Sequence, residues 1–163
     1  MVSDSNGQNK VNVLFVCMGN ICRSPMAEAV FRDLVRKEGL ADRFEIASAG
    51  TGDWHVGEPP HHGTRETLKR HGIAPDGLVA KHVSQALLDR ADYVVAMDDE
   101  NVADLRSWRV DRQKVSRLLD YAPDGEMRDV PDPYYDGRFE LVYQLVSLGS
   151  AGLLQLIREQ HNF

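Results

Sequence analysis

Residues 13–25 read VLFVCMGNICRSP, and this stretch decides the fold of the 163-residue chain. Its apolar start, VLFV, predicts a short strand that is buried on both faces. Ser24 and Pro25 are the cap residue and the first-turn proline of a following helix. Five residues link Cys17 to Arg23, which supplies enough backbone N–H groups to surround one tetrahedral oxyanion. The stretch therefore predicts a strand, an anion-binding loop and a helix in succession.

Strand and helix patterns alternate along the rest of the chain. Short apolar runs predict further strands over residues 44–48, 93–97 and 115–119. Helical spacing of apolar residues, or an acidic helix start, predicts helices over residues 24–39, 60–71, from 98 onward and 139–157. The last helix is expected to be interrupted at Gly149 and Gly152.

This alternation implies a parallel sheet with right-handed crossovers. We predict an α/β fold: a single three-layer domain over residues 11–163, with a four-stranded parallel twisted sheet and helices on both faces. Residues 1–10 predict a flexible N-terminal tail. Cys17 would lie at the carboxyl end of a strand, where ligands bind in such sheets. The Pro-, Asp- and Gly-rich residues 122–137 predict a long loop, a frequent place for functional residues.

Composition excludes several classes of function. The net charge is −6, and the 19 basic residues are scattered among 25 acidic ones, so no nucleic-acid partner is expected. We find neither an apolar run of roughly 18 residues nor a signal core, so we expect a cytoplasmic protein without a membrane partner. The two cysteines lack the spacing of a zinc site or a disulfide scaffold. We interpret His55, His61 and His62 as surface residues, and expect no metal and no cofactor.

Cys17 is the candidate nucleophile. Loop N–H groups, the positive end of the following helix and the Arg23 guanidinium all favour its thiolate form, which is the reactive one. The Ser24 hydroxyl could donate to the sulfur as well. The same donors suit a phosphoryl group, because Arg binds two of its oxygens at once. The alternative is a buried, inert thiol, but the combination of strand, loop, Arg and helix start favours chemistry.

Five segments relate the chain to a known family: VLFVCMGNICRSPMAE, SAGTGDWHVG, KRHGI, AMD and DPYYDG, in this order. The chain resembles the low-molecular-weight protein tyrosine phosphatases from about residue 11 to the C-terminus. The resemblance implies hydrolysis of aryl phosphate monoesters through a phosphocysteine intermediate. Its substrate would be a tyrosine-phosphorylated protein. The oligomeric state is open, with a monomer favoured.

The resemblance implies a second catalytic residue and a phosphate-binding loop. Asp132 would protonate the departing phenolate and then activate water, a role typically worth about 10²–10⁴ in rate. Read from the sequence by itself, the favoured interpretation is a turn-forming Asp before proline, and only the resemblance favours catalysis. The loop residues would be Met18, Gly19, Asn20, Ile21, Cys22 and Ser24.

Supporting and pocket residues are also implied by the resemblance. Asn20 would adopt a left-handed conformation, which Asn tolerates, held by Ser48 and His71. The alternatives are a strand-end Ser and a helix C-terminal His. Aromatic pocket walls, deep enough for a phenyl ring, are assigned to Trp54, Tyr134 and Tyr135, each of which could instead belong to the core.

Cys22 has two interpretations. In the family, the second loop cysteine can form a disulfide with the nucleophile under oxidation, which protects the nucleophile from irreversible oxidation. The alternative is a buried spectator thiol.

Four other functions compete with a tyrosine phosphatase. A thiol-coupled arsenate reductase shares the fold and loop, but its family uses two further cysteines that this chain lacks. A protein-arginine phosphatase carries Thr where this chain has Ile21. A phosphate sensor or a phosphocarrier would need the loop but not Asp132.

Overall fold

The computed structural model describes residues 9–123 and 127–163, so residues 1–8 of the predicted tail lie outside the described residues. The strands are β1 (Val11–Cys17), β2 (Phe44–Gly50), β3 (Tyr93–Ala96) and β4 (Val115–Arg117). The α-helices are α1 (Arg23–Lys37), α2 (His62–Arg70), α3 (Gln85–Arg90), α4 (Asp99–Asp104), α5 (Pro133–Asp136) and α6 (Phe139–His161). Short 3-10 turns are η1 (Ala41–Arg43), η2 (Leu105–Ser107), η3 (Arg112–Lys114) and η4 (Leu118–Tyr121).

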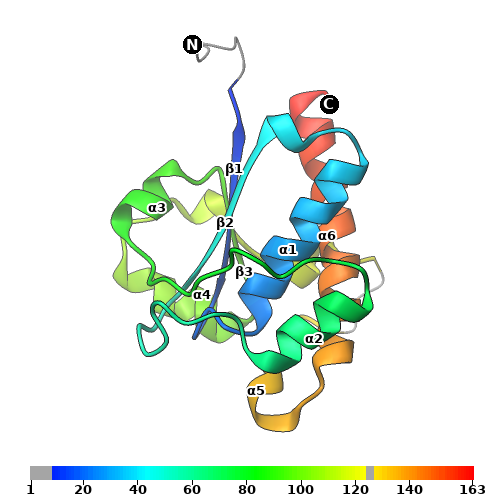
Figure 1. The fold of residues 1–163 in the computed structure, drawn as a ribbon. Coiled ribbons are helices and arrows are strands. Elements are labelled where there is room, and N and C mark those ends of the chain that lie inside the picture. Colours follow the sequence, from blue (N-terminus) through cyan, green and yellow to red (C-terminus); the bar gives the residue numbers. More distant parts are fainter. Residues whose placement is uncertain (1–8, 124–126) are drawn as a thin grey trace.

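The strands form one parallel sheet in the order β2-β1-β3-β4. β1 lies inside the sheet, and its last residue, Cys17, is in register with Gly50 of β2. Helices α1, α2 and α6 lie on one side of the sheet, and α3 and α4 on the other (Figure 1). The predicted three-layer α/β fold with a four-stranded parallel sheet is confirmed.

Both faces of β1 are buried, as its continuous apolar run predicts. Phe15 packs edge-on against Phe31 of α1, with ring centroids 5.6 Å apart, in the core beneath α1 and α6. Leu14 and Val16 face the smaller core beneath α3, which contains Leu88. Cys17 is therefore held at the end of a rigid strand between two packed layers.

Helix α6 is continuous, so the predicted interruption at Gly149 and Gly152 is wrong. A Cβ on Gly152 would lie 1.9 Å from the Tyr121 carbonyl oxygen, and one on Gly149 would lie 2.8 Å from that of Leu118. These glycines therefore allow η4 to approach the helix closely, which a larger residue would prevent.

Helix α6 is also long and apolar enough to cross a membrane, with a mean hydropathy of 1.3 in its most apolar 18-residue window. Polar residues such as Gln144 and Ser147 interrupt this helix, so it is not the uninterrupted apolar run that was sought in the sequence. The helix packs against α1 and η4, and its buried residues, which include Val146 and Leu153, belong to the core. Its apolar composition is therefore explained by its place in the domain.

Two short helices were not anticipated. Helix α3 begins after Ser84, whose hydroxyl accepts the N–H of Leu87 at 3.2 Å. Helix α5 lies within the predicted long loop, and the carboxylate of Asp132 caps it by accepting the N–H of Tyr134 at 3.0 Å. The side chain of Asp132 therefore projects from the start of a helical turn, where its position is fixed by that cap.

Candidate active site

The loop between β1 and α1 curves around the sulfur of Cys17. Its backbone reverses at Asn20, which has a left-handed φ of 56°. The backbone N–H of Asn20 consequently points at the Cys17 sulfur, with a distance of 3.3 Å from nitrogen to sulfur. The hydroxyl oxygen of Ser24 lies 3.0 Å from the same sulfur. Both contacts suit a thiolate, which accepts hydrogen bonds from its surroundings.

Side-chain hydrogen bonds hold Asn20 in this conformation. The backbone N–H of Lys81 donates to its Oδ1 at 2.9 Å, which orients the amide. Its Nδ2 then donates to the hydroxyl oxygens of Ser24 at 2.7 Å and Ser48 at 2.9 Å. The Ser48 hydroxyl in turn donates a hydrogen bond to a carboxylate oxygen of the buried Glu28, at 2.6 Å. Because the Ser24 oxygen already accepts from Asn20, its proton is free to point at the sulfur of Cys17.

The expected role of Ser48 at Asn20 agrees with these contacts, but that of His71 does not. His71 is the C-terminal cap of α2 and faces α6. Its Nε2 lies 2.8 Å from a Glu140 carboxylate oxygen, and its ring stacks on Tyr143 with centroids 3.7 Å apart. The third support of Asn20 is instead the main chain of Lys81. His71 therefore joins α2 to α6 rather than supporting the loop.

Arg23 is the charged wall of the site. Its side chain is only 4% exposed, and one guanidinium nitrogen lies 2.5 Å from a carboxylate oxygen of Asp98. The same nitrogen donates to the Val130 carbonyl at 3.1 Å, and the other lies 3.6 Å from Asp132. Burial by itself would lower the pKa of Arg23, but the charges of Cys17, Asp98 and Asp132 raise it above its usual value. The guanidinium is therefore permanently charged and fixed in orientation.

Asp98 was not identified from the sequence as a site residue. It follows β3 and caps α4 through a capping box with Asn101. The other oxygen of its carboxylate is the one that contacts Arg23. Its position at the carboxyl end of a central strand was the available signal, because Cys17 lies at the same edge of the sheet.

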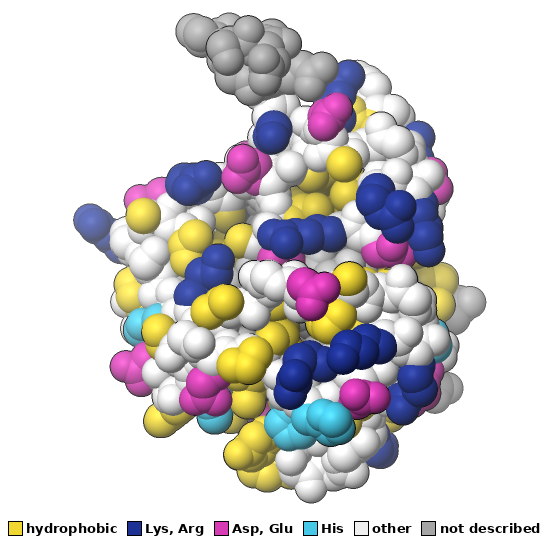
Figure 2. Space-filling model, in the orientation of Figure 1, with side chains coloured by type: hydrophobic (Ala, Val, Ile, Leu, Met, Phe, Trp, Pro, Cys, Tyr) yellow, Lys and Arg dark blue, Asp and Glu magenta, His cyan; other side chains and the backbone are white. Residues whose placement is uncertain are grey.

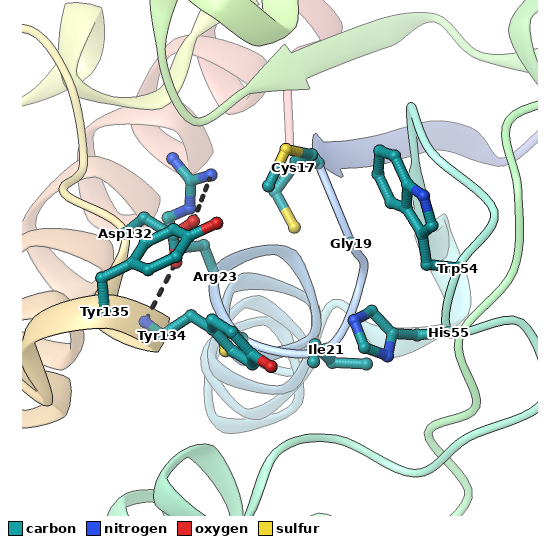
Figure 3. A pocket seen from close by; sticks show the side chains of 11 residues that line it. Cys17, Gly19, Ile21, Arg23, Trp54, His55, Asp132, Tyr134 and Tyr135 are labelled. Atoms are coloured by element: carbon teal, nitrogen blue, oxygen red, sulfur yellow. Dashed lines mark hydrogen bonds and ion pairs between the residues drawn. The ribbon is translucent and has the colours of Figure 1, made fainter.

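A cavity of about 290 Å³ opens above the Cys17 sulfur, and its lining combines the predicted loop, acid and aromatic residues: Cys17, Met18, Gly19, Ile21, Cys22, Arg23, Trp54, His55, Asp132, Tyr134 and Tyr135. Figure 3 shows Asp132, Tyr134 and Tyr135 on the side of Arg23, and Trp54 across from them. Trp54, Tyr134 and Tyr135 are 67%, 50% and 77% exposed, so they form the rim of the cavity and not part of the core.

His55 stands beside Trp54 in the cavity wall, so its interpretation as a plain surface residue is wrong (Figure 3). Its Nδ1 lies 3.1 Å from a carboxylate oxygen of Glu58. His61 has a structural role, because its ring nitrogen accepts the N–H of Gly63 at the start of α2.

The chain matches the family described as "Low molecular weight phosphotyrosine protein phosphatase" over residues 12–162. It belongs to this phosphatase family. It is 53% identical over 152 residues to the low molecular weight protein-tyrosine-phosphatase YfkJ of Bacillus subtilis, covering 92% of this chain and 97% of YfkJ. It is 41% identical over 153 residues to PtpA of Staphylococcus aureus, covering 93% of this chain and 97% of PtpA.

Solved structures agree with this assignment. The crystal structure of YfkJ superposes with a TM-score of 0.91 at 52% identity, covering 94% of this chain and 98% of YfkJ. A Drosophila arginine phosphatase superposes with a TM-score of 0.82 at 32% identity, covering 90% of this chain and 97% of that chain.

The two cysteines of the phosphatase are both free thiols with different surroundings. Cys22 packs with Ile21 and Ala80, and burial, followed by the charges of Cys17 and Asp132, raises its pKa to about 12. A thiol is neutral at pH values below its pKa. Cys22 is therefore protonated at pH 7 and is not a nucleophile.

Iodoacetamide at pH 7 is therefore expected to alkylate Cys17 and to leave Cys22 unmodified in the native phosphatase. Peptide mass spectrometry after a timed reaction measures both sites in one sample. Inorganic phosphate should slow the labelling of Cys17 if it binds in the same cavity. Equal labelling of the two cysteines would contradict this assignment of the reactive thiol.

Gly50 supports the loop through its lack of a side chain. A Cβ at this position would lie 2.8 Å from the Met18 carbonyl oxygen and 3.2 Å from the Asn20 nitrogen. Gly50→Ala is expected to displace the loop and to lower kcat/KM by about 10- to 100-fold, since small displacements at a reacting centre are costly. Gly39→Ala, at the far end of α1, is the control for general destabilisation. If Gly50→Ala and Gly39→Ala have equal thermal stability and lose equal activity, the prediction is contradicted.

Proposed function

We propose that this phosphatase hydrolyses phosphotyrosine in proteins through a phosphocysteine intermediate. The observation that carries the proposal is the arrangement around one cavity of the Cys17 sulfur, the Asn20 N–H, the Arg23 guanidinium and the Asp132 carboxyl. A nucleophile, donors for an oxyanion and a proton source are the parts that phosphoryl transfer requires.

In the first step, the thiolate of Cys17 attacks phosphorus as the bond from phosphorus to the tyrosine oxygen breaks. Asp132 gives its proton to that oxygen, so neutral tyrosine departs. Arg23 and the loop N–H groups bind the three equatorial oxygens, on which charge is spread throughout the transfer. Asp98 and the Val130 carbonyl hold the guanidinium in place, so little reorganisation is needed.

In the second step, water attacks the phosphocysteine and Asp132, now a carboxylate, takes up its proton. The bond between sulfur and phosphorus breaks, and the Cys17 thiolate and inorganic phosphate are released. The contacts of the sulfur with Ser24 and the Asn20 N–H support this step, because they stabilise the departing thiolate.

The aromatic rim supports phosphotyrosine as the substrate. Trp54, Tyr134 and Tyr135 stand above the sulfur and would contact a phenyl ring, whereas a phosphoserine is too short to reach past them. Ile21, in the cavity wall, adds apolar surface suited to the ring. We infer that tyrosine-phosphorylated proteins of the cytoplasm are the partners. Phosphoarginine is the second candidate, because a structural relative is an arginine phosphatase.

Turnover of p-nitrophenyl phosphate and of a phosphotyrosine peptide, with a chelator present, tests the activity. Acid quenching during turnover, followed by mass spectrometry, should find a phosphoryl group on Cys17. A label on another residue, or none, would contradict the mechanism. A higher kcat/KM for a phosphoarginine peptide than for the phosphotyrosine peptide would favour the second candidate.

The rate of hydrolysis is expected to have a bell-shaped pH dependence. The mechanism requires a charged Cys17 and a protonated Asp132 in the same molecule, so the rate should pass through a maximum between low and high pH. The pH profile is measured as kcat/KM, from initial rates with p-nitrophenyl phosphate between pH 4 and 9. A rate that rises continuously to pH 8 would exclude Asp132 as a general acid.

A further inference from the structure

A second cavity, of about 440 Å³, lies between α4 and the start of β4 and has no lining residue in common with the active-site cavity. It is lined by Val102, Leu105, Arg106, Trp108, Arg109, Val110, Arg112 and Val115. Five of these side chains are apolar and three are arginines, and no acidic residue is among them. We refer to this cavity as the arginine pocket.

The charge of the arginine pocket is not neutralised by its surroundings. None of the guanidinium groups of Arg106, Arg109 and Arg112 forms an ion pair or a side-chain hydrogen bond with residues 9–123 or 127–163. Acidic residues outnumber basic ones in the chain, and the two kinds are interspersed over the face that Figure 2 shows. In contrast, the neighbouring Arg117 contacts both Asp99 and Asp120. The arginine pocket is therefore a local positive site on a protein of net charge −6, and it is complementary to an anion.

The backbone of the arginine pocket is held in place. The side-chain amide of Gln85 spans the main chain of Arg109, accepting its N–H at 3.2 Å and donating to its carbonyl. The Trp108 N–H donates to the Leu105 carbonyl at 3.0 Å, and Asp111 caps η3. A ligand would therefore meet a preformed surface, which lowers the entropy cost of binding.

From this combination we infer that the arginine pocket binds a second phosphotyrosine of the same protein substrate. Arginine forks match the oxygens of a phosphate, as in other sites that recognise phosphorylated peptides. The indole of Trp108 and the valine side chains provide an apolar surface for the aryl ring. The inference rests on the proposed function, since that function brings phosphotyrosine proteins to the enzyme. A substrate with two phosphotyrosines would then be held at two points, one of them in the active site.

Kinetics with matched peptides test the inference. One peptide carries a single phosphotyrosine, and the other carries a second phosphotyrosine separated by flexible Gly-Ser spacers of increasing length. For the native enzyme, we expect KM to be about tenfold lower for the doubly phosphorylated peptide once the spacer spans both cavities. The R106Q/R109Q/R112Q variant should lose this difference and keep its KM for the singly phosphorylated peptide. A peptide with two phosphotyrosines offers two groups to the active site. This gain is the same for the native and the variant enzyme and does not affect their comparison.

A charge-matched control separates the arginine pocket from general electrostatics. The R36Q/K37Q/R158Q variant removes the same charge from exposed positions of α1 and α6, and it should behave like the native enzyme. V110E, which places an acid in the pocket, should reproduce the loss without removing an arginine. Equal ratios of KM in the native and R106Q/R109Q/R112Q enzymes at every spacer length would overturn the inference. A failure of the proposed function is distinct, because no enzyme would then hydrolyse the singly phosphorylated peptide.

One other outcome also counts against phosphotyrosine in the arginine pocket. If tyrosine sulfate or a pair of glutamates in place of the second phosphotyrosine lowers KM equally, the pocket recognises negative charge in general. A lower KM with the second phosphotyrosine alone, lost in the R106Q/R109Q/R112Q variant, supports the inference.

Discussion

Cys17→Ser is expected to lower kcat for p-nitrophenyl phosphate by at least about 10⁴-fold, the scale seen when a covalent nucleophile is removed. A serine hydroxyl is not ionised at neutral pH, and neither Ser24 nor the Asn20 N–H can act as a base to activate it. Steady-state kinetics measure the loss. The affinity for inorganic phosphate should change little, because the variant retains Arg23 and the loop N–H groups, to which we assign phosphate binding.

Cys22→Ser is the matched control for this experiment. It makes the same chemical change a few residues away, in the same loop, at a thiol whose pKa is raised to about 12 by burial. We expect it to retain most of the activity at neutral pH. Loss of activity in Cys22→Ser, together with retention in Cys17→Ser, would reverse the assignment of the nucleophile.

Asp132→Ala is expected to have an effect that depends on the leaving group. With phenyl phosphate, whose leaving oxygen is basic, kcat should fall by about 10²–10⁴-fold, the usual contribution of a general acid. With p-nitrophenyl phosphate, whose leaving oxygen is a much weaker base, the loss should be far smaller. The ratio of the two losses identifies proton donation more securely than either loss separately, and equal losses would remove Asp132 as the general acid.

Asp136→Ala is the control for the position of Asp132. Asp136 ends the same short helix, α5, and its hydrogen bonds with Arg138 lower the pKa of its exposed carboxyl. Its removal changes the charge of this segment without touching the cavity. We expect equal kinetics for Asp136→Ala and the native enzyme with both substrates, so a leaving-group effect in Asp132→Ala alone would be specific.

Local patterns predicted the parts of the fold in which neighbours in the chain decide the structure. The apolar run of β1 and the Ser24-Pro25 helix start are of this kind, because burial on both faces and helix capping depend on adjacent residues. The glycines of α6 were misinterpreted for the opposite reason. Gly152 makes room for the Tyr121 carbonyl, and nothing near Gly152 in the sequence indicates that contact.

The site residues also divide into those that the sequence indicates and those that depend on distant contacts. His71 was placed beside Asn20 through resemblance, but it is the C-terminal cap of α2, and its ring contacts Glu140 and Tyr143 of α6. Asp98 was missed because its contact with Arg23 exists only once the carboxyl ends of β1 and β3 meet. Which partner a polar side chain finds depends on how elements pack, and a linear pattern does not carry that information.

The sequence by itself determined the parallel α/β fold, the family and the loop from Cys17 to Arg23, because the strand, the loop length and the helix start lie in one continuous stretch. Only the tertiary structure decided which distant groups complete that loop: the main chain of Lys81 at Asn20, and the carboxylates of Asp98 and Asp132 at Arg23. The physical reason is that an anion site needs donors and charges converging within a few ångströms. Strand register and helix packing bring them together from segments far apart in the chain.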